Sequence, residues 1–349
     1  MTEDGVSFQR HENGVATITL NQPETLNALT LDMLIPMRDK LRKWRDDDTI
    51  KLVLLEGAGS KGFSSGGDMK TLYQAINQSE ALEEAERFFE VEYKTDELVA
   101  SFPKQIVVCM DGVVMGGGVG LSYGASHRIV TEKTKWAMPE MNLGFFPDVG
   151  AAYFLNQAPG YTGRYLALTA QVLRAADVLY INAADYMIAS DKLDDLKHAI
   201  AVTNWHRPNR DEILDNLLQS YSMQPEQPAT LAELQTEIDA HFAFESVETI
   251  VAALDQADTP FARETMDTML SKSPVSLKVA LAQLIKGETN DLRGCLEVDR
   301  TLARNFMQHN DFFEGVRSVL IDKDQAPQYD YRQLSDVSDE LVNSFFQNH

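Results

Sequence analysis

The sequence predicts an α/β fold with a helical C-terminal portion, and three observations support this prediction. Short apolar runs that are typical of buried strands recur at residues 51–55, 106–110 and 127–131. Glycine-rich loops and helical patterns separate these runs, and such alternation favours a parallel sheet covered by helices. After Leu155 the strand patterns largely stop, and amphipathic stretches with a helical period follow one another toward the C-terminus.

The N-terminal elements begin with a strand hairpin. Residues 6–10 and 15–20 are two short strand patterns, and residues 11–14 supply the turn between them. Thr30 is the expected N-cap of a helix that runs to about Trp44. The further predicted helices span residues 68–73, 81–101, 115–124, 161–170, 175–187, 191–202, 231–241, 247–254, 260–270, 274–286, 292–307, 312–321 and 336–346.

This order of elements predicts two parts of the chain. Residues 1–205 carry all the predicted strands and are expected to form an α/β core. Residues 206–349 are expected to form a helical portion packed on that core. The polar stretch 208–227 holds only a weak helical pattern around residues 212–218, so it is the best candidate for an insertion.

Composition excludes several classes of protein. The chain has 349 residues, of which 44% are hydrophobic and 24% charged, as is usual for globular proteins. Its formal net charge of −22 disfavours nucleic-acid and anionic-membrane partners. No apolar run is long enough to cross a bilayer, and the acidic N-terminus lacks the features of a leader, so we expect a cytoplasmic protein. The two cysteines and seven scattered histidines predict neither a disulfide framework nor a metal site.

Two carboxylates stand out in the apolar stretch 136–155. Glu140 and Asp148 are its only charged residues, each follows a proline, and no Lys or Arg accompanies them. A carboxylate in apolar surroundings has a raised pKa, which suits a general acid or base near neutral pH. The alternative is that both acids lie in loops and point into water.

Two glycine-rich loops, at residues 62–68 and 116–120, each follow a buried strand and precede a helix. Glycines let the backbone approach a ligand, and N–H groups at a helix start are free to bind a negative oxygen. The alternative is that these glycines only allow tight turns. The first loop also fits the nucleophile-elbow pattern around Ser64, but about eight residues separate Ser64 from its strand, so we reject that interpretation.

Five motifs resemble the crotonase superfamily, and in particular its 3-hydroxyisobutyryl-CoA hydrolase branch. They are FSSGGD at 63–68, MGGGVGLS at 115–122, MPE at 138–140, FFPDVG at 145–150 and EGVRSVLIDKDQ at 314–325. The first two are typical of the whole superfamily, whereas FPDVG and the last motif are more specific to the hydrolases. The resemblance implies a crotonase-like spiral of ββα units with a helical C-terminal portion.

The resemblance also implies residue roles. By the family pattern, the backbone N–H groups of Ser65 and Gly117 form an oxyanion hole, and Gly66 and Gly116 contact the substrate. Glu92 falls where the hydrolases place a substrate-contacting acid, and the alternative is a solvated helix glutamate. The expected contacts of coenzyme A, which enters as part of the substrate and not as a cofactor, are Glu24, Leu26, Ala28, Lys61 and Phe63.

One departure from the wider superfamily separates the candidate functions. Enoyl-CoA hydratases use two glutamates, but the first of these positions is Gly120 here and only Glu140 remains. The resemblance thus implies a hydrolase of 3-hydroxyisobutyryl-CoA, or of 3-hydroxypropionyl-CoA, in valine catabolism, with room for a homo-oligomer. Glu140 is the expected nucleophile or general base, and Asp148 is expected to hold the substrate 3-hydroxyl group. The alternatives are an enoyl-CoA isomerase or hydratase and a non-catalytic CoA-binding protein.

Overall fold

The computed structural model describes residues 2, 3, 5–74 and 79–348, and the chain divides into two compact units. Unit 1 comprises Met1–Gly67, Lys94–Ala137 and Leu173–Thr230, and unit 2 comprises Asp68–Tyr93, Met138–Val172 and Leu231–His349. Each unit is therefore assembled from three separate segments. The single boundary expected after residue 205 does not coincide with either unit.

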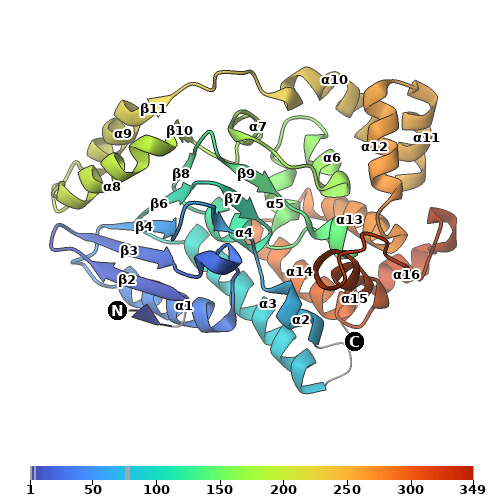
Figure 1. Cartoon of the computed structure of the whole chain (residues 1–349), viewed down its shortest axis with the longest axis horizontal. Coiled ribbons are helices and arrows are strands. Elements are labelled where there is room, and N and C mark those ends of the chain that lie inside the picture. The colour runs from blue at the N-terminus through green and yellow to red at the C-terminus, as the bar shows by residue number, and fades with distance from the viewer. Residues whose placement is uncertain (1, 4, 75–78, 349) are drawn as a thin grey trace. The chain divides into compact units, whose positions relative to one another are not determined.

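Unit 1 contains the main sheet (Figure 1), in the order β1-β2-β3-β4-β6-β8-β10-β11. Its central strands β3, β4, β6, β8 and β10 are parallel, whereas β1, β2 and β11 pair antiparallel at the two ends. The strands of this sheet are Thr2–Glu3 (β1), Val6–Arg10 (β2), Val15–Leu20 (β3), Leu52–Gly57 (β4), Gln105–Met110 (β6), His127–Val130 (β8), Tyr186–Ile188 (β10) and Ser222–Met223 (β11). The predicted hairpin and the three predicted buried strands are confirmed.

Helices α8 (Leu193–Val202) and α9 (Arg210–Tyr221) pack on this sheet. Leu214 and Leu218 of α9 are buried in a core cluster that also contains Trp205 and residues of β4, β6 and β8. The stretch 208–227 therefore contributes a helix to the core of unit 1, and its interpretation as an insertion stays a prediction. Its many polar residues hide a narrow apolar stripe, and that stripe is sufficient to anchor a helix.

The predicted helix at 175–187 is also wrong in its second half. Helix α7 covers only Ala175–Tyr180, and Tyr186–Ile188 forms strand β10 beside β8. Between them, Asn182 adopts a left-handed conformation with φ of 58°. Short apolar segments are ambiguous between helix and strand, and pairing with β8 decides the outcome here.

A second, smaller sheet of unit 1 carries the glycine loops. Strands β5 (Gly62–Ser64), β7 (Val113–Met115) and β9 (Lys135–Ala137) are parallel, and helix α4 (Gly117–Tyr123) follows β7. A short turn of helix at Pro23–Thr25 precedes helix α1 (Leu31–Arg45), which contains Pro36 in its first half. The sequence did not predict the small sheet of β5, β7 and β9, because a strand of three residues is too short to show an alternation of apolar and polar side chains.

The described part of unit 2 is helical. Its helices and helical turns are Met69–Tyr73 (α2), the first part of Ser79–Ala100 (α3), Glu140–Leu143, Ala151–Leu155 (α5), Thr162–Thr169 (α6), Thr230–Phe242 (α10, mostly), Val247–Ala257 (α11), Pro260–Leu270 (α12), Pro274–Gly287 (α13), Leu292–Phe306 (α14), Asn310–Val316 (α15), Arg317–Ile321, Leu334–Asp336 and Asp339–Ser344 (α16). The predicted succession of C-terminal helices is confirmed.

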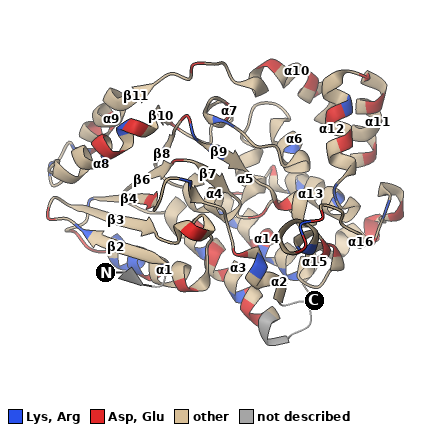
Figure 2. Cartoon of the chain, in the orientation of Figure 1, with Lys and Arg blue, Asp and Glu red and all other residues tan. Residues whose placement is uncertain are grey.

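The core of unit 2 is rich in aromatic rings around Phe145. This ring stacks on Phe89 at 5.7 Å between centroids and also meets Phe146, Phe306 and Phe312. Figure 2 shows Asp and Glu on helices such as α9 of unit 1 and α10 and α11 of unit 2. None of the described helices combines the length and apolarity needed to cross a membrane.

Candidate active site

Glu140 opens a short helical turn in the core of unit 2. Pro139 precedes it, and the turn ends at Gly144, whose N–H donates to the Glu140 carbonyl. Gly144 has φ of 61°, and a side chain there would strike the backbone of Asp311. The Glu140 side chain is only 3% exposed, and its Oε2 atom has no hydrogen-bond partner in the described part of the chain. The interpretation of Glu140 as a loop acid in water is therefore wrong.

Asp148 is buried as well, with 2% exposure, and it has one strong partner. The hydroxyl of Tyr93, on helix α3, donates to Asp148 Oδ2 at 2.7 Å. Neither Glu140 nor Asp148 forms an ion pair within the described residues. No local sequence pattern marks Tyr93 as a partner, because 55 residues separate it from Asp148.

The two carboxyl groups influence each other's protonation. Burial raises the pKa of Glu140 well above its usual range, and the charge of Asp148 raises it further. Burial also raises the pKa of Asp148 to about 7, although the Tyr93 hydrogen bond lowers it. Because one charge disfavours the other, the pair loses its protons in two steps, and one carboxylate is available near neutral pH.

Glu92 lies in the same unit, on helix α3 beside Tyr93. It is 2% exposed, so the interpretation as a solvated helix glutamate is wrong. Burial raises the pKa of Tyr93, and the charges of Asp148, Asp299 and Glu92 raise it further. Unit 2 thus brings together the three predicted acids, and the predicted contact between Glu92 and the substrate stays a prediction.

The two glycine loops meet in unit 1. A Cβ atom added to Gly66 would lie 2.8 Å from the Met115 carbonyl oxygen and 3.1 Å from the Gly117 nitrogen. Gly66 has φ of 90° and Gly116 has φ of 51°. Only glycine fits this close approach without strain, so the glycines do more than allow separate turns. The close approach places the predicted residues Gly66, Gly116 and Gly117 next to one another.

Ser65 does not fit the role expected for it. Its N–H already donates to the Leu26 carbonyl at 2.9 Å, so it is not free to bind a substrate oxygen. Gly66 N–H is also occupied, by the Ser64 hydroxyl at 3.1 Å. Gly67 lies opposite Leu29 in an isolated β-bridge, in which the Leu29 N–H donates to the Gly66 carbonyl. The N–H of Gly67 itself has no acceptor among the described residues.

A cavity of about 300 Å³ lies beside these loops in unit 1. Three of the predicted CoA contacts, Glu24, Leu26 and Lys61, line it, whereas Ala28 and Phe63 do not. The residues that line it are Pro23, Glu24, Leu26, Asn27 and Ala58 to Gly62.

Asn27 joins the two loops that line this cavity, a role that the sequence did not predict. Its side chain is fully buried and donates to the carbonyls of Ala58 and Gly62, each at 3.0 Å. Its Oδ1 accepts the N–H of Gln22 at 2.9 Å. Leu26 and Asn27 are both left-handed, with φ of 58° and 54°. One buried amide therefore fastens the 22–27 loop to the 58–62 loop.

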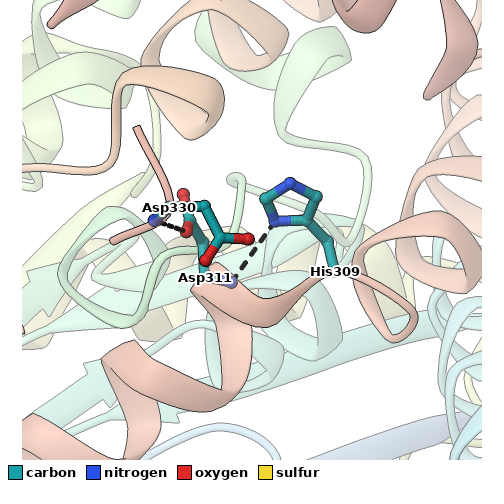
Figure 3. A group of neighbouring side chains, drawn as sticks. All are labelled: His309, Asp311 and Asp330. Carbon is teal, nitrogen blue, oxygen red and sulfur yellow. Dashed lines mark hydrogen bonds between the residues drawn. The ribbon is translucent and has the colours of Figure 1, made fainter. Parts of the chain in front are cut away.

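His309, Asp311 and Asp330 form a separate polar cluster in unit 2 (Figure 3), with candidate ligand atoms within 4.8 Å of one another. Asp311 Oδ1 accepts the Asp330 N–H at 2.9 Å, and its Oδ2 accepts the Ser273 hydroxyl at 2.5 Å. The Asp311 N–H donates to His309 Nδ1 at 3.3 Å. These hydrogen bonds explain the cluster as a structural one, and the absence of a metal stays a prediction.

Known proteins resemble this chain over nearly its whole length. The family model described as enoyl-CoA hydratase/isomerase matches residues 15–346. The curated "3-hydroxyisobutyryl-CoA hydrolase, mitochondrial" of Gallus gallus is 38% identical over 340 residues, which cover 96% of this chain and 87% of that protein. The Homo sapiens protein of the same name is 37% identical over 332 residues, with 95% and 86% covered.

Solved structures agree on the fold. A carnitinyl-CoA dehydratase from Mycobacterium thermoresistibile is 33% identical with a TM-score of 0.91, and the match covers 99% of this chain and 97% of that one. An enoyl-CoA hydratase from Rhodobacter sphaeroides 2.4.1 is 32% identical with a TM-score of 0.86, covering 98% and 97%. The chain therefore has the crotonase fold, belongs to the enoyl-CoA hydratase/isomerase family and groups within it with the relatives named 3-hydroxyisobutyryl-CoA hydrolase.

Proposed function

We propose that this protein hydrolyses 3-hydroxyisobutyryl-CoA, or the related 3-hydroxypropionyl-CoA, to the free hydroxy acid and coenzyme A. The observation that carries the proposal is the buried Glu140 carboxyl, whose Oε2 has no partner in the described part of the chain. A carboxylate left open in apolar surroundings costs stability, and such a group is retained where chemistry uses it. The curated relatives at 36–38% identity carry the name of this hydrolase.

In the proposed reaction, the thioester carbonyl oxygen accepts the N–H groups of Gly117 and Gly67, with Gly67 in the place first expected for Ser65. Gly117 begins helix α4, and the N–H of a first helical residue has no partner within its helix. Two fixed donors stabilise the negative charge that develops on this oxygen, and each is worth roughly 10²–10³ in rate.

Glu140 then acts on the carbonyl carbon in one of two ways. As a nucleophile it forms a mixed anhydride and expels the CoA thiolate, and water cleaves the anhydride afterwards. As a general base it takes a proton from the water that attacks. Both routes consume one water and give one acid and one thiol.

Asp148 is assigned to the acyl hydroxyl group. With Oδ2 occupied by Tyr93, its Oδ1 is the oxygen that accepts the substrate O–H. A buried group that is built for a hydroxyl rejects analogues without one, because its polar atom is then left unpaired. Glu92 is assigned to the same substrate, and Glu24, Leu26 and Lys61 to its CoA portion, with the cavity beside them as support.

A second candidate is dehydration or hydration of the same acyl group. Two solved relatives above 30% identity are described as a dehydratase and a hydratase. A place in valine catabolism and a cytoplasmic location stay predictions, and the names of the vertebrate relatives say mitochondrial.

One experiment separates the two candidates. The protein is given 3-hydroxyisobutyryl-CoA while a thiol reagent records free CoA and ultraviolet absorbance records an enoyl-CoA double bond. We expect thiol release without a double bond. A double bond that appears without thiol would overturn the hydrolase proposal in favour of dehydration, and neither signal would favour a non-catalytic CoA-binding protein.

A further inference from the structure

The turn that carries Asp148 has an unusual backbone. Val149 has φ of 51° and Gly150 has φ of 81°, so two successive residues are left-handed. Val149 is β-branched and buried, and such residues strongly disfavour this conformation. Strain of this kind persists only where the surroundings hold it in place, and it gathers at functional sites. The turn therefore needs a device that holds it.

Two buried side chains from distant helices grip the turn on both sides of Asp148. Asp299 of α14 accepts the Gly150 N–H through Oδ2 at 2.8 Å. Gln283 of α13 donates through Nε2 to the Pro147 carbonyl at 2.9 Å. The same amide donates to Asp299 Oδ1 at 2.7 Å, which joins the two grips into one clamp.

The clamp has features that a simple buried hydrogen bond would not require. Asp299 is fully buried, and its two oxygens are occupied by the turn and by Gln283. The Leu292 side chain packs so closely on Gly150 that any side chain there would lie 2.5 Å from it. The clamp therefore fixes the backbone immediately before and two residues after Asp148, whereas Tyr93 donates to the Asp148 side chain itself.

We propose that Asp299, together with Gln283, is a positioning residue for substrate selection, because it holds the left-handed turn that aims Asp148 at the acyl hydroxyl group. This inference rests on the proposed function. Asp299 does not touch the substrate and acts only through Asp148. Its loss should therefore impair recognition of the hydroxyl more than the attack on the thioester.

The test compares kcat/KM for 3-hydroxyisobutyryl-CoA with kcat/KM for isobutyryl-CoA, which lacks the hydroxyl. In Asp299→Asn, an NH2 group replaces the oxygen that accepts from Gln283, so two donors face each other and the clamp opens. We expect this ratio to fall by about tenfold or more. Gln283→Met, which removes the other grip and leaves Asp299 on Gly150, should lower the ratio in the same direction. If Asp299→Asn does not fold, Gln283→Met still tests the proposal.

A double-variant comparison shows whether the effect passes through Asp148. In an Asp148→Ala background, Asp299→Asn should change the ratio by less than about twofold, because coupled residues are not additive. The matched control is Asp311→Asn, another fully buried acid with both oxygens hydrogen-bonded but without contact to this turn, and its ratio should equal that of wild type.

The outcomes separate two failures. A wild-type protein that releases no CoA overturns the proposed function and this inference with it. An active wild-type protein that selects the hydroxylated substrate, with an unchanged ratio in both clamp variants, overturns this inference alone. The inference also fails if Asp299→Asn lowers the ratio equally with and without Asp148, because the effect then bypasses that residue.

Discussion

Two regions of unit 2 each bury a carboxyl group, but they differ in how many hydrogen bonds that group accepts. In the polar cluster of Figure 3, Asp311 is fully buried, and both of its oxygens accept hydrogen bonds, from Ser273 and from Asp330. In the candidate active site, Glu140 is almost as buried, but its Oε2 accepts none from the described residues.

Under the proposed function, this difference separates a structural acid, Asp311, from a reactive one, Glu140. A buried polar group that is fully hydrogen-bonded stabilises the fold around it, whereas an open one costs free energy. The raised pKa of Glu140 follows from the same cause, since burial without donors disfavours the charge. Burial alone therefore does not mark a catalytic acid. The number of hydrogen bonds that the buried acid lacks is the better guide.

The largest expected effect comes from neutralising the open acid. Glu140→Gln keeps the shape of the side chain but removes the nucleophile or base, so kcat for thioester hydrolysis should fall by roughly 10³-fold or more. Steady-state release of free CoA measures this. Activity within about threefold of wild type would mean that Glu140 is a structural acid like Asp311.

The second effect concerns selectivity and not rate alone. Asp148→Ala removes the proposed acceptor for the acyl hydroxyl, so the preference for 3-hydroxyisobutyryl-CoA over isobutyryl-CoA should fall by roughly 10²-fold or more. Paired kcat/KM values for the two thioesters measure the preference. If wild type already uses both thioesters equally well, the role assigned to Asp148 is wrong.

A third variant tests the pairing of the two acids through pH. Hydrolysis needs Glu140 in its ionised form, and burial and the charge of Asp148 both raise the pKa of Glu140, so the rate should rise with pH as Glu140 ionises. Burial raises the pKa of Asp148, and the Tyr93 hydrogen bond lowers it. In Tyr93→Phe, Asp148 should therefore stay neutral to higher pH and raise the pKa of Glu140 less, so the rising limb should move to lower pH. Profiles of kcat/KM against pH report the shift. A limb that moves to higher pH would contradict this arrangement.

The smallest expected effect on chemistry lies in unit 1, where Asn27 holds the cavity walls. Asn27→Ala leaves the carbonyls of Ala58 and Gly62 without their donor, so KM should rise by about tenfold while kcat changes little. Steady-state kinetics separate the two constants. A collapse of kcat with unchanged KM would show that the loop serves the reaction centre and not CoA binding.

Sequence patterns predicted that Glu140 and Asp148 lie in apolar surroundings, but not which residues hold them. Glu140 and Asp148 could be predicted because two charges in an apolar stretch are visible locally, and their burial is confirmed. Asp299 could not, because 149 residues separate it from Gly150, and a helix aspartate has no local sign of being buried. Long-range packing alone decides such a partner.

The glycine loop at residues 63–68 shows the same limit at shorter range. Its motif predicted oxyanion donors in this loop, but which N–H is free depends on a partner about forty residues earlier. The Ser65 N–H donates to the Leu26 carbonyl, because the left-handed conformation of residues 26 and 27 turns this carbonyl toward Ser65. The strands of the small sheet escaped prediction for a related reason, since they exist only as paired neighbours.

The comparison of the two acids is tested most directly by measuring the unfolding free energy of Glu140→Gln and Asp311→Asn at pH 8, beside wild type. The folded state raises the pKa of Glu140, so the native protein binds more protons than the unfolded chain, and this acid lowers stability as pH rises above about 4.5. Glu140→Gln should therefore be at least as stable as wild type at pH 8, although inactive. Asp311→Asn should lose about 1–3 kcal/mol, because one satisfied partner is left unpaired. An equal loss of stability in both variants would contradict the distinction between a reactive and a structural acid.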